Sequence, residues 1–103
     1  MKKLPEYFSG RGEVFGIEFS QIKRIGNLAI YQRSDGFFEV VTIQTQKAST
    51  ATFDGRLVQF EEKEVYPSGE SWNGSCVSTK EHAYRIFNRE LLKNSIEERL
   101  KSE

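Results

Sequence analysis

Residues 21–45, QIKRIGNLAIYQRSDGFFEVVTIQT, decide the fold because two turn signals divide them into three β-rich runs. The pair Gly26-Asn27 separates residues 21–25 from residues 28–33, and the pair Asp35-Gly36 separates that second run from residues 37–45. Both pairs readily adopt positive φ, which the two-residue turns of β-hairpins require. The segment therefore predicts consecutive antiparallel strands joined by tight turns.

The first strand is predicted to begin near Val14. Phe15, Ile17 and Phe19 share one face by period-two alternation. Ile22 breaks that phase, so we expect a bulge or a strand end near residues 20–21.

The last strand is predicted at residues 56–66, after the turn pair Asp54-Gly55. Its charged residues 61–64, EEKE, are typical of an exposed edge strand, where charge prevents pairing with other sheets. Pro67 then ends the sheet because proline cannot donate a backbone hydrogen bond.

The run at residues 37–45 is apolar on both sides. Phe37, Val41 and Ile43 lie on one face, and Phe38 and Val40 lie on the other. A strand of this kind is usually central in a sheet. If a helix covers one face, the other needs cover from the N-terminal segment, from a loop or from another molecule, and this is the first indication of a partner surface.

The beginning of a helix is marked by a capping box at residues 78–81, STKE, in which Ser78 and Glu81 satisfy free backbone donors. The residues of one apolar stripe are Ala83, Ile86, Phe87 and Leu91. A second stripe, roughly opposite, contains Leu92, Ile96 and Leu100. Since one straight helix cannot dock both stripes on one sheet, a second capping box at residues 95–98 predicts a break near residues 93–95.

The predicted fold is α+β: an antiparallel four-stranded β-meander packed by one C-terminal helix, with a short second helical tail. A length of 103 residues, 37% of them hydrophobic and 13% aromatic, suits one modest core. We therefore expect a single domain over residues 1–103. Its parts are a flexible N-terminal arm at 1–12, the sheet at 13–66, a docked helix at 78–92 and the helical tail at 95–102.

The composition argues against general attraction to nucleic acids or membranes. Lys and Arg total 15, as do Asp and Glu, so the formal net charge is zero. Cys76 is the lone cysteine, which fits a reducing compartment. No stretch approaches the roughly 18 apolar residues of a membrane span, and the charged residues 1–6 lack the apolar segment of a signal peptide. The prediction is a cytoplasmic protein without membrane contact.

Few residues could carry chemistry. Cys76 and His82 could form a nucleophile and base near a helix N-terminus, but no third orienting group or oxyanion motif accompanies them. One cysteine and one histidine cannot make a zinc site. The carboxylates of Glu61, Glu62 and Glu64 are more typical of solvated surface than of a cation site. We therefore expect no catalytic activity, no cofactor and no metal.

Single-stranded nucleic acid is the alternative ligand that the residues favour most. Lys23, Arg24 and Arg33 flank a hairpin that also carries Tyr31. Sheet platforms hold unpaired bases by stacking them on aromatic rings beside cations. The zero net charge, and the need for the same aromatic residues in a small core, argue against this alternative.

Three motifs in the second half of the chain occur together: residues 38–40, FEV, the loop at 66–74, YPSGESWNG, and the helical stretch 83–87, AYRIF. With Tyr31, this layout resembles small uncharacterised phage and mobile-element proteins that have an antiparallel sheet, a Tyr-Pro-Ser-x-Glu-x-Trp-Gly-like loop and a C-terminal Ala-x-x-x-Phe helix. The chain departs from that pattern at Asn73 and after Leu92. The resemblance implies this fold, a mobile-element origin, and a loop packed beneath the helix by its tyrosine and tryptophan, but no activity.

The function predicted from these observations is a non-enzymatic binding module that acts by protein–protein contact, as a phage or mobile-element accessory protein engaging a host protein. Self-association as a homodimer is the simplest way to bury the doubly apolar strand at residues 37–45 and the second helical stripe. The predicted partner-binding residues are Phe37, Val41, Ile43, Leu92, Ile96 and Leu100.

Overall fold

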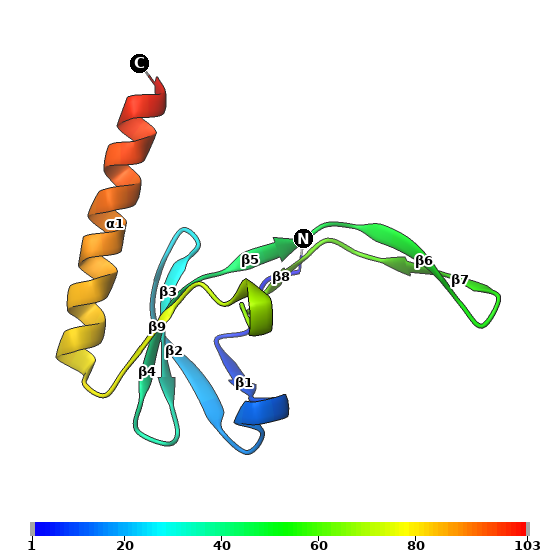
Figure 1. Ribbon diagram of the computed structural model, residues 1–103, viewed down its shortest axis with the longest axis horizontal. Helices are drawn as coiled ribbons and strands as arrows, with labels where there is room; N and C mark the ends of the chain where they lie inside the picture. Colours follow the sequence, from blue (N-terminus) through cyan, green and yellow to red (C-terminus); the bar gives the residue numbers. More distant parts are fainter. Residues whose placement is uncertain (1, 103) are drawn as a thin grey trace.

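The computed structural model describes the backbone of residues 2–102 and the side chains of residues 2–97, and its fold is α+β. Five strands form one antiparallel sheet in the order β1-β2-β3-β4-β9, with one helix packed on it (Figure 1). The bounds are β1 Tyr7–Ser9, β2 Glu18–Ile25, β3 Leu28–Arg33, β4 Phe38–Thr42, β9 Ser75–Val77 and α1 Lys80–Ser102. The predicted class, an antiparallel sheet with a C-terminal helix, is confirmed. The four-stranded meander is not, because β1 and β9 both join this sheet and residues 56–65 do not.

The hairpins that the turn signals predict are present. Gly26, with a φ of +60°, lies between β2 and β3, and Gly36, with a φ of +95°, lies between β3 and β4. The pairing of β2 with β3 shifts register between Gln21 and Lys23, where a bulge was expected. As a result, Ile22 and Lys23 both reach the helix.

The sheet has a core on each of its faces. On one face, strand residues pack against Ala83, Ile86 and Phe87 of α1; these strand residues are Leu28, Ile30, Phe38 and Val40. On the other face, the buried residues are Phe19, Ala29, Tyr31, Val41 and Ile43, and they are covered by Leu4, Phe8, Val14, Ile17 and Tyr66. The N-terminal segment and a loop therefore cover the second face of β4.

Two predicted partner-binding residues are consequently not available. Val41 is 1% exposed and Ile43 is 3% exposed, because the chain's own N-terminal segment lies over them. The expectation that they face a partner is wrong. The loop motif differs from expectation as well, since Tyr66 packs on this face and not beneath the helix, with the ring of Trp72 6.4 Å from its own.

The N-terminal segment is tied to the fold, in contrast to the flexible arm expected at residues 1–12. β1 pairs with β2, and Lys2 forms a parallel bridge with Lys63. Lys63–Val65 is β8, which pairs with β5, Gln44–Gln46. The charged run therefore does not end the main sheet. The carboxylate of Glu64 is enclosed, because it accepts hydrogen bonds from the backbone N–H of Leu4 and from the guanidinium of Arg24.

The helix is continuous from Lys80 to Ser102, so the predicted break near residues 93–95 and the separate tail at 95–102 are wrong. The reason is local: residues 80–102 contain no glycine or proline, and serine and glutamate are tolerated on an exposed helical face. The N-terminal cap also differs by one residue. Thr79 Oγ1 accepts a hydrogen bond from the backbone N–H of His82 at 3.2 Å, and Ser78 lies outside the helix.

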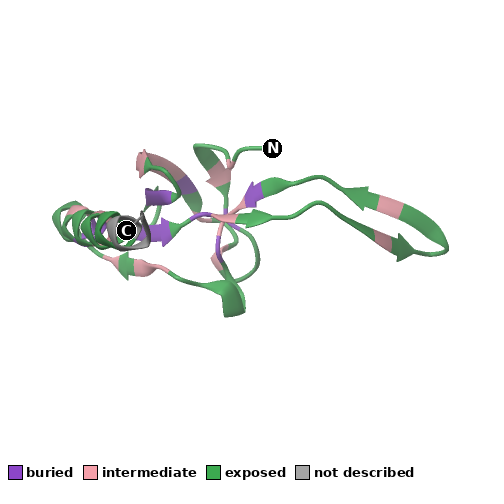
Figure 2. Cartoon of the chain, turned by 90° about the horizontal axis from the view of Figure 1, so that it is seen from above, coloured by how far each residue is buried: buried purple, intermediate pink, exposed green. Residues whose placement is uncertain are grey.

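The molecule extends in two directions from the sheet. The second half of α1 rises beyond the strands, and a β-hairpin made of β6, Ser49–Phe53, and β7, Arg56–Phe60, projects from the other side (Figure 1). The hairpin and residues 92–97 of α1 are largely exposed, whereas the strands of the main sheet contain many buried residues (Figure 2). The described part of α1 is not long and apolar enough to cross a membrane.

Candidate functional site

The projecting hairpin is the most distinctive surface of the fold, and we call residues 47–62 the arm. β6 and β7 pair in register from Ser49 opposite Phe60 to Phe53 opposite Arg56. The turn between them has positive φ at Asp54, +50°, and at Gly55, +74°. These angles are those of a type I′ turn, whose twist matches that of the strands it joins.

The arm is held to the body at its root, where the backbone N–H of Lys2 donates to the carbonyl oxygen of Glu62 at 3.3 Å, but its strands are not supported by the core. Among the described helices and strands, β6 and β7 pack only against each other. The longest dimension of the molecule is 50 Å, and the arm extends along it (Figure 1). An isolated two-stranded hairpin is at best marginally stable in water. The arm is therefore the part of the chain that gains most from a contact outside it.

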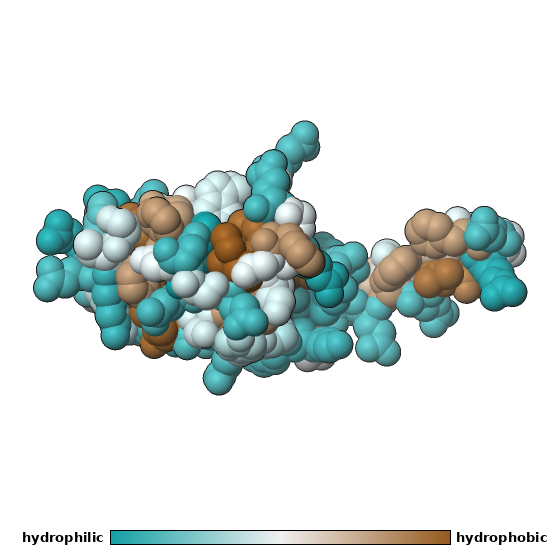
Figure 3. Space-filling view, turned by 90° about the horizontal axis from the view of Figure 1, so that it is seen from below, coloured by the Kyte–Doolittle hydropathy of each residue, from teal (hydrophilic) through white to brown (hydrophobic). Residues whose placement is uncertain are grey.

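One face of the arm is mostly apolar, and we call it the arm face. Strand alternation places Ala51, Phe53, Val58 and Phe60 on it, together with Ser49 and Arg56. The rings of Phe53 and Phe60 meet edge to face with centroids 6.4 Å apart, yet these side chains are 58% and 37% exposed. Leu57, on the opposite face, is 71% exposed. Figure 3 shows apolar side chains gathered on the arm, away from the body. Exposed aromatic residues of this kind mark contact surfaces.

The arm carries little net charge. Lys47 and Arg56 are its basic residues, and Asp54, Glu61 and Glu62 are its acidic ones. Ribbons that enter a groove of DNA or track a phosphate backbone need an excess of positive charge. The arm has a slight excess of negative charge, so its chemistry suits a protein surface better than a nucleic acid.

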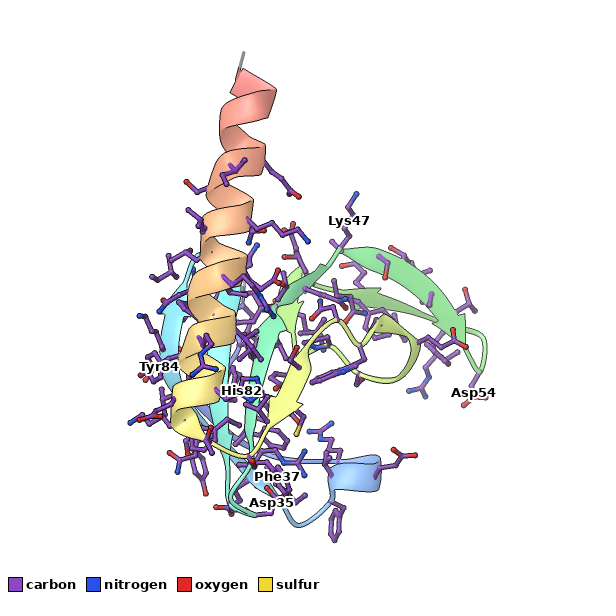
Figure 4. The ribbon with its side chains drawn as sticks, turned by 60° about the vertical axis from the view of Figure 1, so that its left-hand side comes forward. Asp35, Phe37, Lys47, Asp54, His82 and Tyr84 are labelled. Carbon is purple, nitrogen blue, oxygen red and sulfur yellow. The ribbon has the colours of Figure 1, made fainter. Side chains whose placement is uncertain are left out.

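The remaining predicted partner residues lie apart from one another. Phe37 is 43% exposed and lies in the β3–β4 turn. It is at the opposite end of the fold from residues 92–97 of α1, whose side chains are exposed and which we call the free half of α1 (Figure 4). Leu92 and Ile96 lie one turn apart on that free half and are 63% and 49% exposed. The side chain of Leu100 lies outside the described residues. These positions do not form one surface with each other or with the arm.

The residues predicted to hold unpaired bases are engaged inside the fold. Tyr31 is fully buried, and its hydroxyl donates to the carbonyl oxygen of Pro5 at 3.1 Å, so its ring cannot stack on a base. The ammonium of Lys23 lies 5.0 Å from the ring centroid of Phe87. The expected stacking platform is therefore wrong, because its aromatic residue belongs to the core.

The two arginines of that set are paired with acids. Arg24 donates two hydrogen bonds to Glu64, at 2.9 and 2.7 Å. Arg33 donates to Asp35 at 2.5 Å and to Glu39 at 2.8 Å. Charges compensated in this way contribute little to binding a phosphate backbone.

Cys76 lies in β9, opposite Glu39, and accepts a hydrogen bond from the guanidinium of Arg33 at 3.8 Å. Loss of hydration raises the pKa of its thiol, and the nearby carboxylate of Glu39 raises it further. Both effects oppose the thiolate that a nucleophile needs. His82 lies in the first turn of α1 with its side chain exposed. Among the described residues, no group of three or more His, Cys, Asp or Glu side chains could hold a metal ion.

A groove of about 1090 Å³ lies between the N-terminal segment and the loop that follows β8. Its wall includes Phe8, Tyr66 and Trp72. The buried carboxylate of Glu39 also lines the groove, but it is already paired. It accepts hydrogen bonds from the hydroxyl of Tyr66 at 2.5 Å and from the guanidinium of Arg33 at 2.8 Å. Burial and this hydrogen bond raise the pKa of Tyr66. The groove therefore presents aromatic surface without a free buried charge.

Sequence reasoning missed the arm because its first strand, residues 49–53, was not recognised. The signal is present: Asp54-Gly55 is a strong hairpin turn, and β-branched and aromatic residues flank it on both sides. Comparison with protein-family models, curated proteins and solved structures found no significant match.

Proposed function

We propose that the protein is a non-enzymatic binding module that acts by protein–protein contact, and that the arm is its contact element. The observation that carries this proposal is the exposure of Phe53 and Leu57 on a hairpin that packs against no other described helix or strand. Aromatic side chains, phenylalanine among them, are enriched in protein interfaces, where a few buried residues carry most of the binding energy. A host protein as partner is a prediction within this proposal.

A protein partner is favoured over an unpaired nucleic acid by charge and by burial. The arm has three acidic and two basic residues. Tyr31, the aromatic residue of the predicted nucleic-acid site, is enclosed. The nucleic-acid alternative would require salt-dependent binding to an unpaired oligonucleotide. We expect no such binding to the full chain at low salt.

The test compares an arm-face variant with a matched variant elsewhere. Phe53→Ser with Phe60→Ser removes the aromatic rings of the arm. Leu92→Ser with Ile96→Ser removes apolar side chains of comparable or greater exposure from the free half of α1. Each of the three proteins is used to capture partners from a cell lysate. A protein that binds the wild type and the helix variant, but not the arm variant, is then purified. Its affinity for all three proteins is measured by isothermal titration calorimetry.

The expected result is binary binding that the arm variant weakens by more than about 30-fold, the loss typical of hot-spot aromatics. Because the arm packs on no other element, thermal unfolding of the core should be nearly the same in all three proteins. A purified partner that binds the arm variant with wild-type affinity, or whose binding is lost in the helix variant alone, would remove the arm from the proposal.

A further inference from the structure

The outer edge of β6 is unprotected. Its sequence, STATF, has no charged residue and no proline, and its pairing with β7 has no bulge. Exposed edge strands are normally blocked by one of these features, because free backbone groups pair readily with another strand. Thr50, Thr52 and Phe53 also belong to the residue types that favour β-strands.

The register of the arm tells which backbone groups are free. In a hairpin with a two-residue turn, the residues next to the turn, Phe53 and Arg56, exchange backbone hydrogen bonds. Ala51 therefore also directs its N–H and C=O toward β7. Thr50 and Thr52, which alternate with these residues, direct theirs outward. The free groups of β6 thus belong to two threonines placed symmetrically about Ala51.

We propose that two copies of the chain pair through β6, antiparallel, so that their arms form one four-stranded sheet in the order β7-β6-β6-β7. The two-fold axis passes between the Ala51 residues, and Thr50 of each copy exchanges backbone hydrogen bonds with Thr52 of the other. This proposal rests on the arm being the contact element of the proposed function, and it names a second copy as the occupant of the β6 edge.

Charge complementarity supports this register. Lys47 lies at the root of the arm and Asp54 at its tip (Figure 4). With Ala51 opposite its counterpart, Lys47 of each copy lies opposite Gly55 of the other, one residue from Asp54, so each end of the pairing brings a positive charge near a negative one. The same symmetric pairing through β7, centred on Val58, would place Asp54 opposite Glu62, which is repulsive. The β6 edge is therefore the favoured one.

The pairing also combines the two arm faces. Phe53 of one copy comes opposite Ser49 of the other, whose neighbour on β7 is Phe60. Only small side chains, serine and alanine, separate the rings of the two copies. Pairing of this length buries less than about 1,200 Å² in total, which is the range of weak, reversible interfaces. We therefore expect a dimer that forms at high micromolar concentration and dissociates on dilution.

Sedimentation velocity of the full chain over a concentration series tests the pairing. Thr50→Pro removes an outward N–H on β6, and Gln59→Pro removes the corresponding N–H on the opposite edge of the arm. The wild type and Gln59→Pro should shift from monomer to dimer with concentration, whereas Thr50→Pro should remain monomeric. A wild type that stays monomeric at several hundred micromolar, or a Thr50→Pro variant that dimerises like it, would overturn the proposal.

Cross-linking tests the register itself. In a Cys76→Ser background, Ala51→Cys places two thiols at the axis, where facing Cβ atoms of a pair without hydrogen bonds come within disulfide range. Mild oxidation should link this variant into dimers, but should leave Val58→Cys largely unlinked. Equal yields of cross-linked dimer from the two variants would contradict the β6 register. A monomeric wild type that still binds a partner through Phe53 would refute the dimer alone and leave the proposed function standing.

Discussion

Replacing Glu64 with glutamine tests whether an ion pair holds the N-terminal segment on the sheet. The carboxylate accepts two hydrogen bonds from Arg24, at 2.9 and 2.7 Å, and one from the backbone N–H of Leu4, at 2.9 Å. These contacts join β2, β8 and the segment that covers Val41. Glutamine keeps the size of the side chain and removes its charge, so the change isolates the electrostatic part of the contact.

The magnitude follows from the pKa of the carboxyl. The hydrogen bonds from Arg24, followed by that from Leu4, lower the pKa of Glu64 from 4.5 to about 2. A difference of this size corresponds to at most about 3.5 kcal/mol. Because 17% of the Arg24 side chain is exposed, solvent screening brings the expected contribution to about 1–2 kcal/mol. The variant should then unfold about 5–10 °C below the wild type at pH 7.

The sign of the pH dependence is fixed by the direction of the pKa change. The folded chain keeps the carboxylate ionised where the unfolded chain protonates it, so the contribution is complete above about pH 4.5. It should disappear as pH falls toward 2. Urea unfolding of the wild type and Glu64→Gln between pH 7 and pH 2 measures this convergence, with Glu61→Gln as the matched exposed control. A difference that is constant over this range, or no larger than that of Glu61→Gln, would refute the reasoning.

Three further predictions concern the helix and the cysteine. Thr79→Ala removes the cap of α1 and should lower the free energy of unfolding, measured with urea, by about 1 kcal/mol. Ser78→Ala should change it by less than about 0.5 kcal/mol. A larger loss for Ser78→Ala than for Thr79→Ala would show that Ser78 is the cap. Phe87→Ala leaves a cavity at a fully buried site and should lower the free energy of unfolding by about 3–5 kcal/mol. Ile96→Ala should lower it by less than about 0.5 kcal/mol, because this side chain is exposed. Similar losses for the two variants would mean that Ile96 is packed. Because the pKa of Cys76 is raised above 9.0, its rate of alkylation should still be rising at pH 9, and a rate that levels off below pH 8 would contradict this.

The local features of the fold could be predicted from sequence because they depend on neighbouring residues. The turns at Gly26 and Gly36 require positive φ, and the bulge near Gln21 shows as a break in alternation. The docked part of the helix is also predicted, but its cap is Thr79 and not Ser78, and the predicted break near residues 93–95 is absent. Ser78 and Thr79 are equally good caps by residue type, and only the geometry of the backbone decides between them.

The sequence predicts that the second sheet face is covered, but it does not tell which segment covers it, because that depends on contacts distant in sequence. Leu4 and Glu64 are 60 residues apart, and Arg24 joins the same contact from β2. Nothing in the residues 61–64 indicates that Glu64 turns inward while Glu61 and Glu62 stay exposed. Of the three predicted sources of cover for the second face of β4, the structure has two, the N-terminal segment and a loop.

The arm, and not the second face of the sheet, is therefore the candidate partner surface. Val41 and Ile43 are sealed by the N-terminal segment, whereas Phe53 and Leu57 have no comparable cover among the described residues. A hairpin of this kind is marginal by itself, and a second strand along β6 would supply the backbone hydrogen bonds and apolar contact that it lacks. Since the arm does not pack on the core, pairing would stabilise the arm with little effect on global unfolding. Amide exchange at Thr50 and Thr52, measured as a function of protein concentration, is thus a more direct report on such pairing than the melting temperature.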